Sequence, residues 1–133
     1  MIVLDASALV ELLDTATGQA VAVRIADPTL GLHVPHLADV EVVQALRRYA
    51  KDGELDAAAA AVALEGLHAL DLQRHPHEPL LDRVWELRHN VSAYDAICVA
   101  LADALDTRVL TCDGRLARAP GASRRVELVR PPS

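Results

Sequence analysis

Aromatic residues are almost absent from this chain of 133 residues. It contains one Trp, two Tyr and no Phe, although 52% of its residues are hydrophobic. That hydrophobic content excludes an intrinsically disordered chain. A chain of this length can bury enough surface to fold as one domain without disulfides or structural metals. We therefore expect a single domain over residues 1–133, with a core built from aliphatic side chains.

Cysteine and long apolar runs are also scarce. The two cysteines, Cys98 and Cys112, show no pattern typical of a secreted disulfide framework, so we expect small buried thiols. Met1 leads directly into an apolar run with no basic segment before it, unlike a signal peptide. The longest apolar run, Ala57 to Leu64, is too short to cross a bilayer. These features predict a cytoplasmic protein with no membrane partner.

Positive charge is limited, since 13 Lys and Arg stand against 19 Asp and Glu and give a net charge of −6. This balance argues against gripping nucleic acid through bulk positive potential. Divalent cations held by carboxylates would, however, invert the field locally. Two small basic groups are candidates either for local patches or for solvated faces: Arg47, Arg48 and Lys51, and then Arg124 and Arg125.

Strand and helix patterns alternate along the chain. The apolar runs and turn residues predict strands at 1–5, 30–35, 71–74, 107–112 and 125–129. Helical spacing and stop signals predict helices at 6–13, 17–26, 37–51, 55–70, 80–89 and 92–106, with a helical turn at 115–118. This order is typical of an α/β fold. We expect a central parallel sheet of about four or five strands with helices on both faces.

Four acidic residues fall where such a sheet would gather them. Asp5 and Asp113 each follow a buried strand, and ligands of open α/β sheets bind at the carboxyl ends of the strands. Glu41 and Asp95 lie near the starts of helices that can pack beside the same edge. Crowded carboxylates repel one another, so they coexist at low cost only around a cation, and their hard oxygens suit Mg²⁺ or Mn²⁺. Metal sites of this kind commonly catalyse phosphodiester hydrolysis.

Each acid also has a local explanation that the sequence leaves open. Asp5 is placed to cap the helix after it, and Asp95 completes a capping-box variant that begins at Ser92. Asp113 precedes Gly114 and can be a turn residue. Glu41 lies near a helix start, where the macrodipole favours negative charge. A buried unpaired carboxylate costs several kcal/mol, however, and the segments around Glu41 and Asp95 are apolar.

Several stretches resemble PIN-domain ribonucleases, and within that family the VapC-type toxins of toxin–antitoxin pairs. They are the opening MIVLDASALVELL, then LADVEVVQALRR, LRHNVSAYDAICVALA and VLTCDGRLARAPG. In that family a strand-end Asp followed by x-Ser or x-Thr opens the chain, and a helical Glu, a Tyr-Asp-Ala segment and a Thr-x-Asp segment follow. Asp5, Glu41, Asp95 and Asp113 match these positions in order. The stretch from about 53 to 80 carries no motif of the family.

The resemblance implies cleavage of RNA that depends on Mg²⁺ or Mn²⁺, with one or two ions bound. Asp5 and Asp95 would be direct ligands, and Glu41 and Asp113 would complete the site directly or through water. Ser7 and Thr111 would support the ligands or a phosphate oxygen, although both hydroxyls also fit capping or strand-end roles.

The resemblance also implies protein partners, namely a cognate VapB-like antitoxin and a second copy of the chain in a homodimer. The apolar helical segments 9–25 and 37–50 are plausible surfaces for such contacts, although their apolar faces equally suit core packing.

Other functional classes remain open at this point. A protein-binding module on a PIN-like scaffold would need no catalysis, although none of the four acids is missing. An aspartate-based phosphotransfer domain also uses a strand-end Asp, but the only lysine is Lys51, at the end of a helix. The pairs His33 with His36 and His75 with His77 have suggestive zinc spacing but no further clustered ligand.

Overall fold

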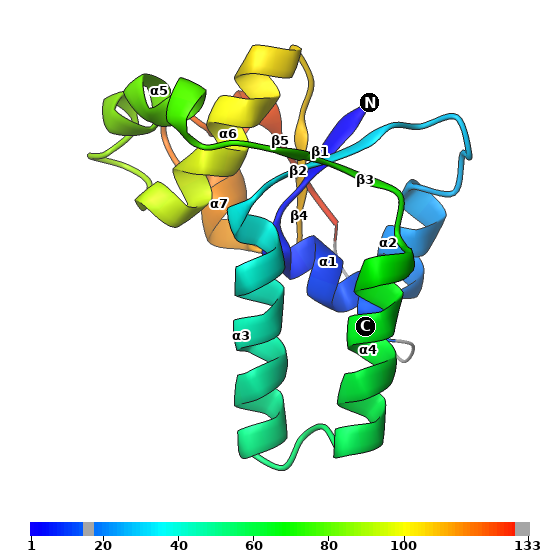
Figure 1. Ribbon diagram of the computed structural model, residues 1–133. Coiled ribbons are helices and arrows are strands. Elements are labelled where there is room, and N and C mark those ends of the chain that lie inside the picture. The colour runs from blue at the N-terminus through cyan, green and yellow to red at the C-terminus, as the bar shows by residue number, and fades with distance from the viewer. Residues whose placement is uncertain (15–17, 130–133) are drawn as a thin grey trace.

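A parallel sheet of five strands runs through the middle of the protein (Figure 1). The computed structural model describes residues 1–14 and 18–129. The strands are ordered β3-β2-β1-β4-β5, and every neighbouring pair is parallel. Their bounds are β1 Ile2–Leu4, β2 Leu32–Pro35, β3 Leu72–His75, β4 Val109–Thr111 and β5 Val126–Leu128. The predicted α/β class and the number of strands are confirmed.

The order of the strands places a switch point at the centre of the sheet. The chain builds outward from β1 through β2 to β3, then returns to the other side of β1 to add β4 and β5. In open α/β sheets the crevice for ligands lies outside the carboxyl ends of the strands at this reversal. Asp5 directly follows β1, and Asp113 lies two residues after β4. Two of the four predicted site residues therefore flank the switch point.

Helices cover both faces of the sheet, as the sequence predicts. The α-helices are α1 Ala6–Leu13, α2 Gln19–Arg24, α3 Leu37–Lys51, α4 Ala57–Ala69, α5 Leu81–Glu86, α6 Ala93–Leu105 and α7 Gly114–Arg118, and two short 3₁₀ helices span Glu78–Leu80 and Ser123–Arg125. The expected helix 17–26 begins at a residue outside the described part of the chain; within the described residues 18–26, the helix is α2, Gln19–Arg24. None of the helices over the described residues is long and apolar enough to cross a membrane.

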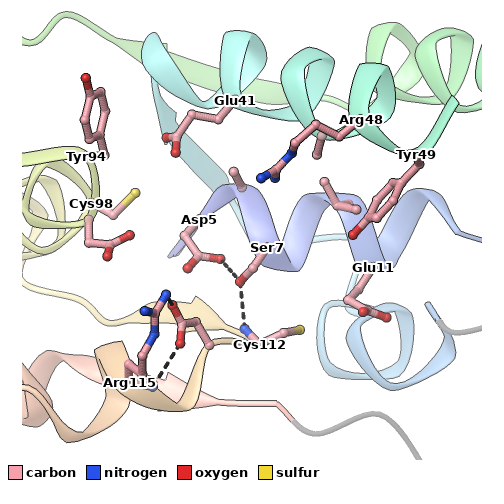
Figure 2. Close-up of a pocket in the computed structure, with 15 residues that line it drawn as sticks. Asp5, Ser7, Glu11, Glu41, Arg48, Tyr49, Tyr94, Cys98, Cys112 and Arg115 are labelled. Atoms are coloured by element: carbon pink, nitrogen blue, oxygen red, sulfur yellow. Dashed lines mark hydrogen bonds and ion pairs between the residues drawn. The ribbon is translucent and has the colours of Figure 1, made fainter. Parts of the chain in front are cut away.

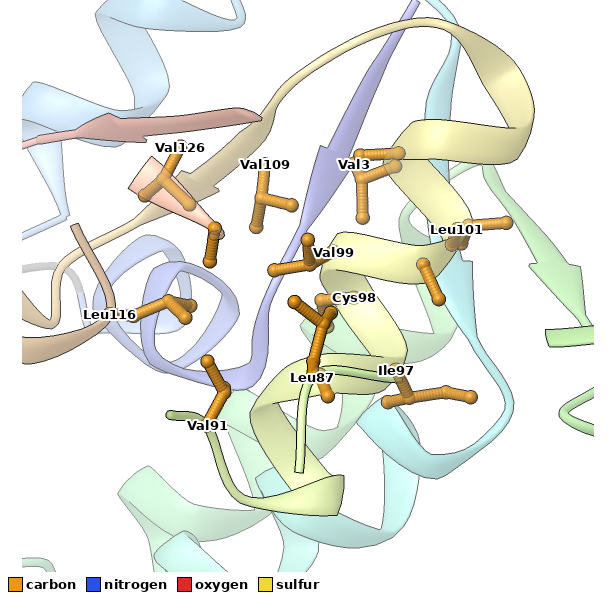
Figure 3. Close-up of a cluster of buried hydrophobic side chains, with 14 of the residues drawn as sticks. Val3, Leu87, Val91, Ile97, Cys98, Val99, Leu101, Val109, Leu116 and Val126 are labelled. Carbon is orange, nitrogen blue, oxygen red and sulfur yellow. The ribbon is translucent and has the colours of Figure 1, made fainter. Parts of the chain in front are cut away.

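Successive side chains of each strand point to opposite faces of the sheet, and this divides the core into two hydrophobic clusters. Val3 and Val109 point to one face, where they pack against helix α6, whose residues 96–102 are all buried (Figure 3). Their neighbours Leu4 and Leu110 point to the other face, beneath α1 and α3. All of these strand residues are fully buried. The sheet is therefore covered on both sides, as expected for parallel strands with continuous apolar sequences.

Helix α5 departs from the prediction. The pattern predicts a helix over 80–89, but the α-helix ends at Glu86, and residues 87–90 form turns. Leu87 N–H is shared between the carbonyls of Arg83 and Val84, which tightens the last turn. Leu87 itself is buried in the cluster under α6. Anchoring this side chain turns the chain toward Ser92, whose hydroxyl then caps α6.

Helices α3 and α4 extend side by side beyond the edge of the sheet (Figure 1). Asp56 caps α4 by accepting a hydrogen bond from the backbone N–H of Ala59 at 2.7 Å. The alanine run that follows has high helix propensity but little side-chain area to bury. As a result α4 buries only Ala63 and Leu67, whereas α3 buries Ala38, Val42 and Ala45.

Candidate active site

One pocket of about 410 Å³ lies at the carboxyl edge of the sheet, and all four predicted acids line it (Figure 2). Asp5 enters from the end of β1 and Asp113 from the end of β4. Glu41 lies in the second turn of α3 and Asp95 in the first turn of α6. Four segments that are far apart in the sequence thus meet around one space, as the strand-end argument predicts.

Asp5 is the most constrained of the four. Its side chain is only 6% exposed. One carboxylate oxygen accepts from the Ser7 hydroxyl at 2.7 Å and from the backbone N–H of Ala8 at 2.9 Å. The other oxygen accepts from the Thr111 hydroxyl at 2.5 Å. Burial raises the pKa of Asp5 above its usual value, and the hydrogen bonds from Thr111 and Ser7 oppose that rise.

The two hydroxyls connect β1 to β4. Ser7 Oγ accepts from the backbone N–H of Cys112 at 3.0 Å, and Thr111 Oγ1 accepts from that of Asp113 at 3.0 Å. Each hydroxyl has a single proton. When both protons are donated to Asp5, none remains for the 3.1 Å approach between the two hydroxyl oxygens. Ser7 and Thr111 therefore hold Asp5 in place and fix the strand end that carries Asp113.

Glu41 is half-buried and electrostatically strained. Burial, together with the negative charges of Asp95 and Asp5, raises its pKa to about 7. Such a shift arises when desolvation and like charge both disfavour the ionised form. The Glu41 carboxyl therefore gains and loses its proton near neutral pH, unlike an ordinary surface glutamate.

Asp95 and Asp113 complete the ring of acids. Burial and then the charge of Asp113 raise the pKa of Asp95, while Arg115 partly offsets the effect. Asp113 accepts from the backbone N–H of Arg115 at 2.9 Å, and the Arg115 guanidinium lies 3.5 Å from its carboxylate.

Local capping contacts at Asp5, Asp95 and Asp113 exist alongside the shared pocket, whereas the explanation of Glu41 by the helix macrodipole stays a prediction. Asp5 caps α1, Asp113 caps α7, and Ser92 caps α6 through the backbone N–H of Asp95. Capping orients each helix start toward the sheet edge, so the same hydrogen bonds that begin the helices also aim the acids. Capping and a site role are therefore compatible at Asp5 and Asp113.

The donor set fits a hard divalent cation in its chemistry. The acids supply only oxygen ligands. Burial, and after it the charges of neighbouring carboxylates, raise the pKa values of Asp5, Glu41 and Asp95, and a bound cation would offset both costs. Within residues 1–14 and 18–129, however, no three His, Cys, Asp or Glu side chains already converge as a metal-binding group. The carboxylates stand around the pocket rather than around a single point.

A model of a known domain family matches most of the chain. Residues 2–122 match the family model described as PIN domain. The chain is also 44% identical over 129 residues to Ribonuclease VapC1 of Mycobacterium tuberculosis, covering 96% of this chain and 97% of that protein. This chain belongs to the PIN-domain family. The resemblance to VapC-type members is confirmed by this relative.

Solved structures agree with the PIN fold. The PAE2754 protein of Pyrobaculum aerophilum is 27% identical and has a TM-score of 0.65, covering 91% of this chain and 81% of that one. A toxin–antitoxin complex from Klebsiella pneumoniae contains a chain with a TM-score of 0.66 and 14% identity, covering 96% of each chain. The latter likeness concerns the fold alone.

The pocket of this PIN domain contains residues that the sequence analysis did not single out. Among them are Glu11, Tyr49, Tyr94 and Arg115. Oε2 of Glu11 is buried and has no hydrogen-bond partner among residues 1–14 and 18–129. The sequence could have indicated that Glu11 faces the pocket, because Glu11 lies four residues after Ser7 and so on the same face of α1. Tyr94 belongs to the Tyr-Asp-Ala segment that identified Asp95, but that segment gave the tyrosine no role of its own.

The two basic groups named from the sequence do not form the free basic patches that were one of their two interpretations. Arg48 lines the acid pocket, whereas Arg47 lines a groove between α3 and α4, so the two do not form one patch there. Arg125 is engaged with Asp103 at 2.8 Å and with Asp106 at 3.0 Å. The second group therefore contributes Arg125 to internal ion pairs and not to a free basic patch.

Three of the histidines make contacts within the fold, and the two cysteines are thiols. His33 Nδ1 lies 2.9 Å from His75 Nε2, and His77 Nε2 accepts from the backbone N–H of Leu37 at 2.8 Å. Both cysteines are free thiols; Cys98 is buried, as expected, whereas Cys112 is only partly buried. Burial places the thiol pKa of Cys98 well above its usual value and raises that of Cys112 to about 11, so neither is a reactive thiolate at neutral pH.

Proposed function

We propose that this protein is an endoribonuclease that hydrolyses RNA phosphodiester bonds with Mg²⁺ or Mn²⁺, as the toxin of a toxin–antitoxin pair. The observation that carries the proposal is the meeting of Asp5, Glu41, Asp95 and Asp113 around one pocket at the switch point of a PIN fold. The relationship to a protein named Ribonuclease VapC1 supports the choice of RNA as substrate.

Asp5 and Asp95 would hold the cation, with Glu41 and Asp113 completing the site directly or through water. When bound, one or two ions would supply positive charge at the phosphate and activate water for hydrolysis. Ser7 and Thr111 keep Asp5 in a fixed orientation, so its share of the site needs little rearrangement. Glu41, with a pKa of about 7, must release its proton when the ion enters. Ion binding should therefore strengthen as pH rises through neutrality.

The proposal includes a protein inhibitor that covers the pocket, because the fold is shared with a chain of a toxin–antitoxin complex. An apolar groove lined by Val10, Leu13, Leu46, Leu55 and Val62 lies between α1, α3 and α4, close to the acid pocket. Parts of both helical segments predicted from the sequence line this groove. A VapB-like antitoxin bound there would lie beside the acids, and homodimer formation is proposed from the family resemblance alone.

Cleavage of labelled structured RNA tests the proposal directly. Purified protein is incubated with Mg²⁺, with Mn²⁺ or with EDTA, and Asp95→Asn is compared with Asp71→Asn, an exposed acid outside the pocket. We expect metal-dependent cleavage by the wild type and by Asp71→Asn, and loss of cleavage in Asp95→Asn. Cleavage that persists in EDTA, or in Asp95→Asn, would contradict the assignment of the acids.

The remaining possibility, a binding module without catalysis, predicts a different result. In that case neither RNA cleavage nor calorimetric heat from Mg²⁺ or Mn²⁺ would be detected.

A further inference from the structure

We infer that Tyr49 and Tyr94 stack on unpaired bases of an RNA strand lying across the acid pocket, and that Arg48 contacts its phosphates. The inference rests on the proposed nuclease function and deepens it, because it identifies residues that select single-stranded over paired RNA. None of the three residues is needed to hold the cation.

The first observation is where the few aromatic side chains lie. All three are exposed: Tyr49 by 39%, Trp85 by 67% and Tyr94 by 64%. Aromatic side chains ordinarily contribute large buried area to a core, and here neither core cluster contains an aromatic residue. Two of the three nevertheless line a single pocket, the one that contains the acids.

Trp85 provides an internal contrast. Its ring faces the guanidinium of Arg88 at 4.4 Å, and Arg88 also donates to the Trp85 carbonyl at 2.8 Å. Trp85 does not line the acid pocket and belongs to a separate surface near Leu81 and Val91. The exposed ring of Trp85 thus already has a cation–π partner within the chain.

The second observation is that the tyrosines bracket the acids. Figure 2 shows Tyr94 on one side of Asp5 and Tyr49 on the opposite side, beyond Arg48. Glu41, Arg48 and Tyr49 are spaced i, i+7 and i+8 on α3, so they share one helix face. Arg48 lies about 10 Å along the axis from Glu41, at 1.5 Å per residue. That is roughly three nucleotides at the ~3.4 Å per-strand rise of a stacked helix.

The third observation concerns charge. With a net charge of −6, the overall field of the protein repels RNA, so binding needs local contacts. Over residues 1–14 and 18–129, Arg48 makes no side-chain hydrogen bond or ion pair, whereas Arg115 lies against Asp113. The Arg48 guanidinium is therefore available for a phosphate near Tyr49.

Together these contacts favour a strand whose bases are unpaired. Aromatic side chains stack on bases that are splayed out, and bases in a duplex are already stacked and paired. Every base offers a π-face, so the contacts would select single strands or loops without choosing a sequence.

Binding of RNA to single variants tests the inference. Fluorescence anisotropy is measured with a labelled, unstructured RNA oligonucleotide and with the duplex made from it. The buffer contains Ca²⁺, which the same oxygen ligands accept, and gels check that the RNA stays intact. We expect the wild type to prefer the single strand, and Tyr94→Leu and Tyr49→Leu each to bind it about tenfold more weakly. Tyr94→Phe, Tyr49→Phe and the matched control Trp85→Leu should retain wild-type affinity.

Arg48 has its own matched control in the neighbouring Arg47, which lies outside the pocket. Arg48→Gln should weaken binding and reduce the slope of log affinity against log salt by about one, while Arg47→Gln leaves the slope unchanged. Equal effects of the two substitutions would show that the contact is nonspecific and would overturn the role of Arg48.

Cleavage of the same oligonucleotide in Mg²⁺ or Mn²⁺ separates this inference from the proposed function. Cleavage by the wild type with unchanged binding by both leucine variants overturns the stacking role and leaves the nuclease intact. Weaker binding by these variants without any cleavage supports stacking and counts against the nuclease. Equal affinity of the wild type for duplex and single strand, or no binding at all, overturns the inference.

Discussion

The strand side and the helix side of the acid pocket are built in different ways. On the strand side, the Asp5 carboxylate is buried and accepts hydrogen bonds from two hydroxyls and a backbone N–H. On the helix side, Glu41 is half-buried, and the influences on its pKa are burial and the charges of Asp95 and Asp5, with no hydrogen bond among them. Hydrogen bonds favour the charged form of a carboxyl, whereas burial and like charge oppose it.

This difference shows which part of the site is complete without a ligand. The Asp5 side has the hydrogen bonds that a buried carboxylate needs, so its geometry is set by the fold. On the Glu41 side, negative charges lie close together, and no contribution to the pKa of Glu41 offsets their repulsion. Perturbed pKa values of this kind cluster at functional sites, and a cation is the ligand that would relieve the cost here. The two sides can therefore be tested separately.

The largest effect is expected from removing the charge at the ordered side. Asp5→Asn should reduce RNA cleavage by roughly 10³-fold or more, because a ligand and its charge are lost together. Helix α1 should remain, since Asn is as good an N-cap as Asp. Cleavage rates and circular dichroism measure the two effects.

Asp56→Asn is the matched control for this change. Asp56 also caps a helix through its side chain, at the start of α4 and outside the pocket. It should retain full cleavage activity. Equal losses of activity in both variants would mean that capping, and not the site, accounts for the effect of Asp5.

A smaller effect is expected from removing one support of Asp5. Thr111→Val keeps the shape of a fully buried side chain but deletes the hydroxyl that donates to Asp5 and accepts from Asp113 N–H. We expect a loss of about 1–3 kcal/mol in the free energy of unfolding, measured by urea denaturation. Cleavage should fall by about 10–100-fold, as for other residues that orient a metal ligand.

Thr107→Val serves as the comparison, because its hydroxyl donates to the Met1 carbonyl at 2.7 Å in an exposed setting. It should cost less than 1 kcal/mol or so and leave cleavage unchanged. If Thr111→Val were no more harmful than Thr107→Val, the strand side would not depend on its hydrogen bonds.

The same contrast explains what the sequence could predict. Asp5 and Asp113 follow apolar runs, and parallel strands place such residues at one edge, so their meeting follows from the fold class. The argument for Glu41 and Asp95 from the residues was weaker, because a helix near the edge can rotate its acids toward or away from it, and the family resemblance strengthened it. The structure shows that burial of Val42 and Ala45 beside Glu41, and of the apolar face of α6 beside Asp95, sets that rotation.

Other features depend on tertiary contacts that no local pattern encodes. The end of α5 at Glu86 follows from the burial of Leu87 under α6, and periodicity alone extends the helix further. The hydroxyl bridge from Ser7 to Cys112 joins residues 105 positions apart. Tyr49 and Tyr94 enter the pocket because α3 and α6 approach it from opposite sides, which only the assembled fold determines.

The smallest expected effect isolates the helix side through pH. The folded-state pKa of Glu41 is about 7, above its ordinary value of 4.5, so the folded protein holds a proton that the unfolded chain has released between these values. By linkage, the free energy of unfolding then falls as pH rises through this window and levels off above it. Glu41→Gln mimics the protonated form, so without metal it should be more stable than the wild type near pH 8. We expect a gap of about 1 kcal/mol, discounted because Glu41 is only half-buried.

The quantity to measure is the difference in unfolding free energy between the wild type and Glu41→Gln in EDTA, from about pH 4.5 to pH 8. Taking the difference cancels the titration of other groups, including His33, whose pKa is lowered by burial and by His75. A difference that stays constant with pH would show that Glu41 is not strained. Added Mg²⁺ should reverse the ranking, because an ion that binds only the folded state stabilises the wild type and not a variant that has lost a ligand. That reversal would tie the electrostatic cost of the helix side to the cation it is proposed to hold.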